Sequence, residues 1–376
     1  MVKKIGRDGI CLYYHKIDKL QEGLKTMAYQ AQLRQIGERL QQGSPDQYLE
    51  FLVQKEKIER ILQLREEKEV LILGHNYMAP LVYNLSGEGE RGDSLQLSQY
   101  AARSDKPIIL FDGVRFMAET AKILNPRKKV LIADANAGCS LADPFSAAEV
   151  LQYKEQYPGR PVVLYINSYA AAKAEADYCC TSSNGLKVVQ HAARELGVKE
   201  VIFLPDSLMG QNLDEEVKMA GLDLELIYPG KYDQKRGACE VHEQISYEMV
   251  RAIRLQFNLS HDDPTAAVLV HWECKPKVVA EADFHGSTSA MIRYVREHPE
   301  LKRVYLGTEC EMTANLQQEF PQIDFVRTCS LACQHMARIT LDKILQTLES
   351  EQPEVVVPEE IRVRALASIE RMLMIQ

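Results

Sequence analysis

Short apolar runs alternate with amphipathic stretches through most of this chain, from residue 69 onward. The first three runs are VLILGHNY (70–77), PIILFDGV (107–114) and KVLIAD (129–134). Stretches with helical periodicity, such as RFMAETAKIL (115–124), separate the runs. Buried strands that alternate with helices are typical of parallel sheets with helices on both faces. The pattern therefore predicts an α/β protein.

The same order of elements occurs three times, which predicts three pseudo-symmetric αβα units with parallel sheets around a common centre. In each unit a strand is followed by a Ser/Thr-rich helix start, a second strand, a helix, a third strand, a cysteine and another helix. The expected boundaries are 67–157, 158–262 and 263–348 for the units, 1–66 for a helical N-terminal extension, and 349–376 for a C-terminal tail and helix that pack back on the body.

The N-terminal extension contains two polar, helix-like stretches. The segment Gln42-Gly43-Ser44-Pro45-Asp46 interrupts them. Ser44 and Asp46 are both suitable N-caps, and Pro45 is tolerated in the first turn of a helix. We therefore expect one helix to end here and a second to begin.

Composition excludes several classes of protein. The chain has 376 residues, 45 basic and 53 acidic, and a net charge of -8, which does not favour nucleic-acid binding. No apolar run is long enough for a membrane helix, and the basic N-terminus lacks the apolar segment of a secretory signal. Nine cysteines without an export signal indicate a reducing compartment, so we expect a cytoplasmic protein whose cysteines bind metal or act in catalysis.

Three of the cysteines, Cys139, Cys239 and Cys333, follow a strand or loop and precede a helical stretch, one in each unit. A thiol at a helix N-terminus is expected to ionise more readily, because the helix dipole stabilises the thiolate. Three separate thiolates predict an iron–sulfur site with one iron left free. A zinc site made of these cysteines and His242 is the alternative.

The other cysteines have no equivalents in the repeat. Cys179, Cys180, Cys274 and Cys310 are expected to be structural thiols. Cys329 forms a CxxxC pair with Cys333, and it is either redox-active or simply adjacent.

Each unit also has a Ser/Thr-rich motif that opens a helix: Gly92-Asp93-Ser94, Thr181-Ser182-Ser183-Asn184 and Gly286-Ser287-Thr288-Ser289. Free N–H groups and the helix dipole make helix N-termini suited to phosphate or carboxylate. Simple N-capping explains any one motif, but three equivalent motifs suit a substrate with several anionic groups.

Polar side chains lie at the end of the first strand of each unit. Ligands of parallel sheets bind beyond the carboxyl ends of the strands. They are His75, Tyr77, Tyr165, Asn167, His271 and Glu273. A single buried histidine is often a core residue, but this group combines side chains that can transfer protons.

From residue 69 to the C-terminus, the chain resembles the quinolinate synthase family. The most specific strings are FMAETAKILNP followed by AGCSLAD, and GACEVHE, GSTSAMIRYV and CQHMARITLDKIL occur in the family's order. The resemblance implies three domains around one active site and a [4Fe–4S] cluster with one open iron, held by Cys139, Cys239 and Cys333. It also implies that iminoaspartate and dihydroxyacetone phosphate condense to quinolinate, phosphate and water, with transient contact to the oxidase that makes iminoaspartate.

The resemblance further implies the roles of individual residues. Tyr77, His271 and Glu273 would be catalytic. The substrate-binding positions would be His75, Ser94, Tyr165, Asn167, Ser183, His242, Ser287 and Thr288.

This chain departs from the family's pattern at Asn76, at Trp272, in the segment KYDQKR before Gly237 and in its long N-terminal extension. Trp272 could alter the loop that carries Glu273. Two other functions remain open from the residues alone: an aconitase-like hydratase that uses the same open iron on another acid, and a non-enzymatic iron–sulfur sensor.

Overall fold

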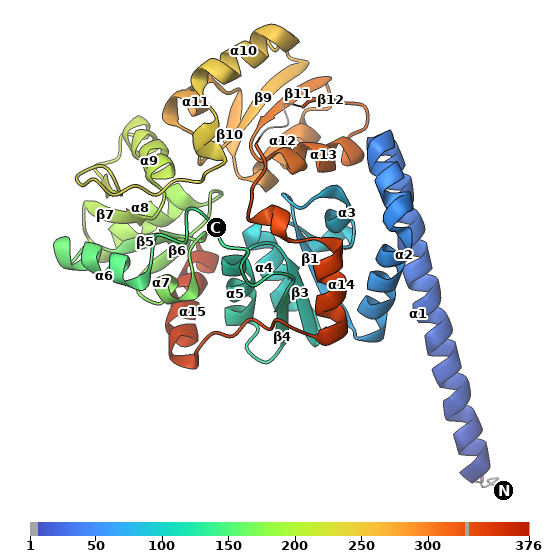
Figure 1. The fold of residues 1–376 in the computed structure, drawn as a ribbon. Coiled ribbons are helices and arrows are strands. Elements are labelled where there is room, and N and C mark those ends of the chain that lie inside the picture. Colours follow the sequence, from blue (N-terminus) through green and yellow to red (C-terminus); the bar gives the residue numbers. More distant parts are fainter. Residues whose placement is uncertain (1–6, 328–330, 376) are drawn as a thin grey trace, which may run out of the picture.

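The structure, a computed structural model, describes residues 7–327 and 331–375. Its N-terminal extension is a pair of long helices, α1 (Arg7–Gly43) and α2 (Pro45–Glu67), which pack against each other at one side of the body (Figure 1). The break between them confirms the prediction: Ser44 is the N-cap of α2, with extended backbone angles, and Pro45 opens the helix. Buried side chains of α2, including Ile58 and Ile61, join the core of the first unit.

Three four-stranded parallel sheets form the body, which confirms the predicted α/β fold. Each sheet has the same strand order, with the second strand at the edge beside the first, followed by the third and fourth. The strands are β1 (Val70–His75), β2 (Arg91–Gly92), β3 (Ile108–Asp112) and β4 (Lys129–Ile132); β5 (Val162–Tyr165), β6 (Tyr178–Cys180), β7 (Glu200–Leu204) and β8 (Glu225–Ile227); and β9 (Ala266–His271), β10 (Phe284–Gly286), β11 (Arg303–Gly307) and β12 (Asp324–Val326).

The edge strands β2, β6 and β10 correct the sequence prediction, which had only three strands in each unit. Each is two or three residues long, too short to give an apolar run or a clear alternation. Strand β6 lies directly before a Ser/Thr-rich motif, and β2 and β10 each end at the first residue of one. Each edge strand thus brings its motif beside the end of the neighbouring first strand.

Helices flank the three sheets. In the first unit they are α3 (Pro80–Tyr83), η1 (Glu88–Glu90), α4 (Ser94–Arg103) and α5 (Arg115–Leu124). In the second unit they are α7 (Ala170–Lys173), α8 (Gly185–Leu196) and α9 (Ser207–Met219). In the third unit they are α11 (Pro276–Glu281), α12 (Thr288–Glu297) and α13 (Cys310–Glu319).

The helix after each cysteine packs on the next unit rather than on its own. Side chains of α6 (Ala147–Gln156) share a core with β5 and β7, and those of α10 (Tyr247–Phe257) share a core with β9. The third helix, α14 (Leu341–Ser350), returns to the core of the first unit and contacts α2. The chain therefore crosses from one unit to the next just after each cysteine. The domain boundaries expected from the sequence remain a prediction.

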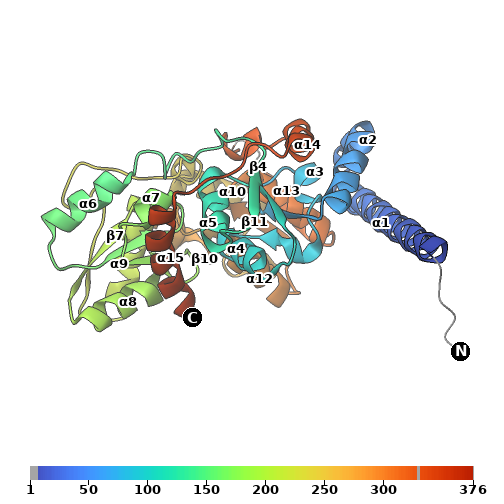
Figure 2. The same cartoon turned by 90° about the horizontal axis from the view of Figure 1, so that it is seen from below.

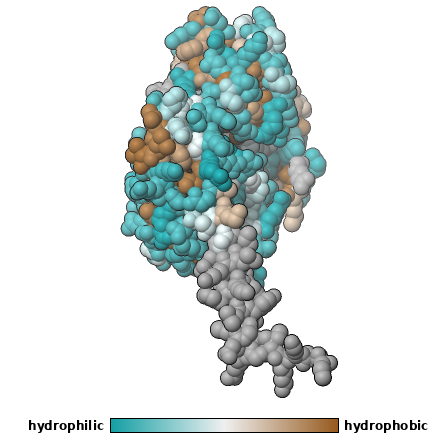
Figure 3. Space-filling view, turned by 90° about the vertical axis from the view of Figure 1, so that its right-hand side faces the viewer, coloured by the Kyte–Doolittle hydropathy of each residue, from teal (hydrophilic) through white to brown (hydrophobic). Residues whose placement is uncertain are grey.

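The C-terminal helix α15 (Glu359–Met374) packs on α7 and β6 of the second unit, on the side of the first unit away from α1 and α2 (Figure 2). Ala365, Ile369 and Met372 are its buried contacts. On the face of the body beside α1, hydrophilic residues predominate and hydrophobic residues gather in small separate patches (Figure 3). Within residues 7–327 and 331–375, no helix is long and apolar enough to span a membrane.

Candidate active site

A cavity lies where the three units meet, and it encloses about 670 Å³, including the part open to solvent. All the site residues expected from the sequence line it, except Ser183. They are His75, Tyr77, Ser94, Cys139, Tyr165, Asn167, Cys239, His242, His271, Glu273, Ser287, Thr288 and Cys333. These residues span most of the chain, and the sheets bring them together because equivalent strand ends point to one centre.

Equivalent residues end the first strand of each sheet. His75, Tyr165 and His271 are the last residues of β1, β5 and β9, and each pairs with the last residue of the edge strand. In two units the following turn is the same: His75 Nδ1 accepts from the backbone N–H two residues on, as does His271 Nδ1, at 3.2 and 3.3 Å. In a neutral imidazole this acceptor role places the proton on Nε2.

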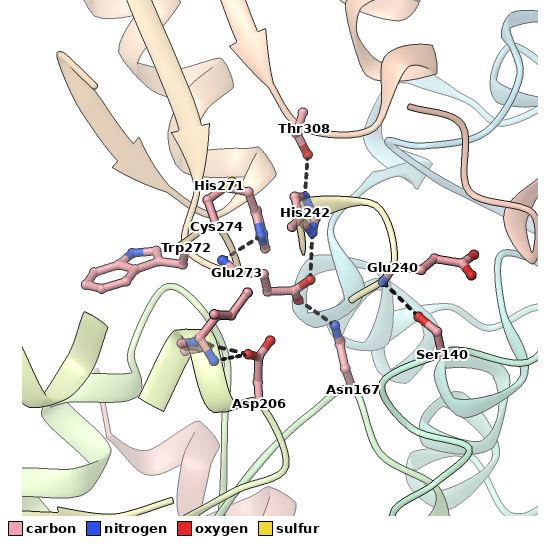
Figure 4. A network of polar contacts seen from close by, with 12 residues as sticks. Ser140, Asn167, Asp206, Glu240, His242, His271, Trp272, Glu273, Cys274 and Thr308 are labelled. Carbon is pink, nitrogen blue, oxygen red and sulfur yellow. Dashed lines mark hydrogen bonds and ion pairs between the residues drawn. The ribbon is translucent and has the colours of Figure 1, made fainter. Parts of the chain in front are cut away.

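Glu273 is the centre of the polar network (Figure 4). One carboxylate oxygen accepts from Tyr165 Oη at 2.8 Å and from Asn167 Nδ2 at 3.0 Å. The other oxygen lies 2.8 Å from His242 Nδ1. The second unit and the segment that follows it thus hold the carboxylate of the third unit in one orientation.

A second chain of contacts runs from His242 to Tyr77 through Thr308. His242 Nε2 lies 2.9 Å from Thr308 Oγ1, which lies 2.5 Å from Tyr77 Oη. Tyr77 and Glu273 are therefore joined by a continuous hydrogen-bonded path through two side chains. Such a path can transfer a proton without bulk water.

The electrostatics of the cavity favour one protonation state at neutral pH. Burial lowers the pKa of His75 and of His271 to about 3, and nearby Glu273 only partly opposes this effect. Burial alone would raise the pKa of Glu273, but the imidazoles of His271 and His242 and the hydrogen bond from Tyr165 lower it to about 2. The site thus holds an ionised carboxylate beside neutral His75 and His271.

The three cysteines occupy matching turns. Each sulfur faces the backbone N–H groups two and three residues further on, such as those of Leu141 and Ala142 for Cys139. The long helices α6, α10 and α14 each begin eight residues after their cysteine. Short 3-10 turns, η2 (His242–Gln244) and η3 (Met336–Arg338), intervene after Cys239 and Cys333. The expectation that these thiols lie directly at a helix N-terminus is therefore wrong.

The expected lowering of the thiol pKa values is also wrong for the thiols without a bound metal. Burial raises the pKa of Cys139 to about 12 and that of Cys333 to about 11, and it raises the pKa of Cys239 well above its ordinary value. The backbone N–H donors oppose this effect but do not reverse it. A metal cation would deprotonate such thiols.

The thiol set fits an iron–sulfur cluster better than a zinc site with His242. Three thiols from three units share one cavity, and their backbone N–H donors are the kind of contact that stabilises cluster sulfurs. Cys239, His242 and Glu273 are close enough to hold an ion. Both ring nitrogens of His242, however, already contact Glu273 and Thr308, so ligation would break the network.

The residues at the starts of these helices cap the helices, and they also face the cavity. Asp93 Oδ1 accepts from Gln96 N at the start of α4, and Ser287 Oγ accepts from Ala290 N at the start of α12. Ser94 and Thr288, one residue further on in each motif, line the cavity. Asp93 and Ser287 thus cap their helices and also line the cavity, and the substrate-binding role expected for Ser287 stays a prediction.

Ser183 lies elsewhere. It is exposed, and its Oγ donates to Ser287 Oγ at 2.8 Å, whereas Ser182 lines the cavity and contacts Tyr165. The structure thus brings Ser182 rather than Ser183 to the cavity lining, and the substrate-binding role expected for Ser183 stays a prediction.

Other residues of the cavity were not expected from the sequence. Glu309 is buried at the N-cap of α13, and burial raises its pKa to about 8. Glu309 directly follows β11, together with Thr308 of the hydrogen-bonded path, so the rule that ligands bind beyond strand ends could have found both residues. The other unexpected members are Met117, Leu141, Ile166 and Val241, while Asp93, Thr181 and Ser182 belong to the Ser/Thr-rich motifs that the sequence had singled out.

Among the described residues, Cys179, Cys180, Cys274, Cys310 and Trp272 lie outside the cavity lining. Cys274 is buried against Gly307 O, and Cys179 against Ser368 Oγ. Cys329 lies outside the described residues. Trp272 points away from Glu273 and packs edge-on against His285, with ring centroids 4.6 Å apart (Figure 4). Its side chain therefore does not reshape the site.

Three α/β units that share one buried polar site define a pseudo-threefold α/β enzyme. A family model described as "Quinolinate synthetase A protein" matches residues 59–374. The chain is 43% identical over 327 residues to quinolinate synthase 1 of Mesorhizobium japonicum, covering 87% of this chain and 94% of that protein. It is 42% identical to the quinolinate synthases of Caulobacter vibrioides (86% and 83% covered) and Xylella fastidiosa (85% and 87% covered).

This chain belongs to the quinolinate synthase family, which serves NAD biosynthesis and implies an iron–sulfur cluster and small-molecule substrates. The family resemblance drawn from the sequence is confirmed. The match begins within α2, so α1 lies outside the matched region.

Proposed function

We propose that this protein condenses iminoaspartate with dihydroxyacetone phosphate to give quinolinate, inorganic phosphate and water. We further propose that Cys139, Cys239 and Cys333 hold a [4Fe–4S] cluster with one open iron. One observation carries the proposal: these thiols line the same cavity as the Glu273 network. No thiol comes from the same unit as another, so the cavity needs all three units to be complete.

The helix starts would hold the anionic groups of the two substrates. The first turns of α4 and α12 bring Ser94 and Thr288 to the cavity, and Ser182 precedes α8. Backbone N–H groups and the helix dipole favour phosphate and carboxylate at such positions. Three separate anion sites match a phosphate and two carboxylates, and they would fix the reacting carbon atoms near each other.

Proton transfer would use the path from Tyr77 to Glu273. Burial raises the pKa of Tyr77 well above its ordinary value, and the nearby Glu273 charge adds to this, so Tyr77 keeps its proton and can donate it to a departing oxygen. Glu273 is ionised and can accept a proton, which His242 and Thr308 can pass toward Tyr77. Neutral His271 would present its Nε2 proton to the substrate.

Tyr165 and Asn167 would act as positioning residues. Both donate to the same oxygen of Glu273, so they fix the direction in which the other lone pairs of the carboxylate point. His75, which ends β1 as His271 ends β9, would bind the substrate from the opposite unit.

The cluster, when bound, would supply a Lewis acid that eases the loss of a hydroxyl group as water. The imine substrate hydrolyses in water, which favours a buried cavity and a transient contact with the oxidase that makes it.

Anaerobic purification tests the proposal. The protein should be brown, contain about four irons and form quinolinate from the two substrates. Cys239→Ala should lose both the cluster and the product, while Cys274→Ala, which removes a buried thiol outside the cavity lining, should keep the cluster. A colourless protein that forms quinolinate would contradict the cluster assignment. A brown protein that dehydrates another acid but forms no quinolinate would favour the aconitase-like alternative.

A further inference from the structure

A second cavity lies between the first and third units, and it is larger than the active-site cavity. It encloses about 1480 Å³, including the part open to solvent. Its walls come from α1, from the segment around η1, and from α4, α12 and α13. Figure 1 shows the C-terminal end of α1 beside α3 and α13, at the seam between these two units.

The cavity is positively charged. Four arginines line it, Arg39, Arg91, Arg293 and Arg296, against two carboxylates, which leaves an excess of two positive charges. The carboxylates of Glu88 and Glu319 form ion pairs with Arg39 and Arg296.

The other two arginines have no carboxylate partner within the described part of the chain. Arg91 donates to the backbone oxygens of Asn84 and Ser86 and to Asn84 Oδ1, which are all neutral acceptors. Arg293 is exposed and makes no hydrogen bond or ion pair with a described residue. Guanidinium groups match the geometry of phosphate oxygens and bind them in pairs.

A buried acceptor in the same cavity lacks a donor. Asn315 is 3% exposed, and its Nδ2 donates to the backbone oxygens of Asn76 and Met78. Its Oδ1 is buried without a partner among the described residues. A buried acceptor left unpaired costs about 1–3 kcal/mol, so the site is suited to a ligand that supplies an O–H or N–H group.

We propose that this cavity binds a nucleotide-sized phosphate ester, with its phosphate groups on Arg91 and Arg293 and a hydroxyl group on Asn315. The space available suits a molecule of this size. Arg39 and Gln42 of α1 contribute to the wall, and both precede the region matched by the family model. The site is therefore partly built by the extension of this chain.

The second cavity adjoins the active site. Asn76, Gly92 and Ser289 line the second cavity, and each is the direct neighbour in sequence of a residue that lines the first. Two hydrogen bonds cross between the units at this wall: Asn76 Nδ2 to Thr288 Oγ1 and Ser289 Oγ to Gln96 Oε1, both 2.8 Å. A ligand in the second cavity would thus sit directly behind the anion-binding helix starts of α4 and α12.

Calorimetric titration of the full-length protein, purified anaerobically with its cluster, tests the site with ADP as the probe. ADP should bind the wild type, and adenosine, which lacks phosphate, should not. Arg293→Gln should weaken ADP binding about tenfold or more, and Arg39→Gln should also weaken it. Arg251→Gln, an exposed arginine on α10 outside this cavity, is the matched control and should bind as the wild type does.

Two outcomes would overturn the proposal. The first is the absence of heat with millimolar ADP, or equal affinity in Arg293→Gln, Arg251→Gln and the wild type. The second is a loss of ADP binding in Ser182→Ala but not in Arg293→Gln, which would locate the nucleotide in the active-site cavity. Neither outcome depends on quinolinate formation, so this test stands apart from the proposed function.

Discussion

His242 Nδ1 lies 2.8 Å from a carboxylate oxygen of Glu273, and the contact joins two functions of the site. The backbone N–H of His242 faces the sulfur of Cys239, while its ring contacts Glu273 and Thr308. One residue therefore connects the thiol turn to the path along which protons can move. A change at the thiols would therefore alter the hydrogen-bonded environment of Glu273 through this single imidazole.

Glu273→Gln should abolish most of the activity and spare the cluster. An amide nitrogen in place of one carboxylate oxygen loses an acceptor for Tyr165 and Asn167 or for His242, and it cannot take up a proton. We expect quinolinate formation to fall by about 10²–10⁴-fold. Iron content and the visible spectrum should match the wild type. Glu297→Gln, an exposed position on α12, is the control, and wild-type turnover in Glu273→Gln would refute the assigned role.

Thr308→Val should break the path between Tyr77 and His242 with little change in shape. The substitution removes the hydroxyl that both side chains contact. We expect kcat to fall roughly 10–100-fold, and the free energy of unfolding to fall by about 1–3 kcal/mol, because two buried polar groups lose a partner. Thr308→Ser keeps the hydroxyl and should restore both. If Thr308→Val and Thr308→Ser turn over equally fast, the path does not serve catalysis.

Neighbouring serines in the second unit provide a matched pair. Ser182 lines the cavity and Ser183 does not, so Ser182→Ala should raise the KM for a substrate about tenfold or more. Ser183→Ala loses only its contact with Ser287 and should change KM by less than about threefold. Steady-state kinetics, with the concentration of each substrate varied in turn, measures the KM of both variants. A larger effect at Ser183 would favour the original sequence prediction.

Buried neutral histidines should make the protein less stable in mild acid. Burial lowers the pKa of His75 and His271 to about 3, while unfolded histidines titrate near 6.5. Between these values the unfolded state binds more protons, so the free energy of unfolding falls as pH falls from about 6.5 toward 3. Each histidine contributes up to about 1.4 kcal/mol per pH unit, a limit that is reached well below pH 6.5.

Urea unfolding from neutral pH to about pH 5 checks this slope. His271→Gln removes one of the titrating groups, so its slope over this range should be shallower than that of the wild type by about 1 kcal/mol per pH unit. Identical slopes would show that His271 is not held neutral in the folded protein.

Much of the architecture follows from local sequence. Apolar runs such as 70–75 and 266–271 predict buried strands, and the residues just beyond them predict a site, because the carboxyl ends of parallel strands meet at one edge. The helix break at Ser44 and Pro45 is equally local, since it depends only on capping and on the missing proline N–H.

Other features required the packed molecule. Local sequence predicts a turn after β6 but does not determine whether Ser182 or Ser183 faces the cavity, because contacts with Tyr165 and Ser287 from other segments decide it. The short edge strands form only because a neighbouring first strand supplies their hydrogen bonds.

By itself, the sequence determined three repeated units, the strand-end side chains and one distinctive cysteine in each unit. Only the tertiary structure decided that α6, α10 and α14 cross to the next unit, which brings Cys139, Cys239 and Cys333 to one cavity. It also decided that, for the thiols without a bound metal, burial raises the pKa values instead of lowering them. The physical reason is the same in both cases. Packing and desolvation depend on which residues surround a side chain in space, and the local periodicity of the sequence does not specify those residues.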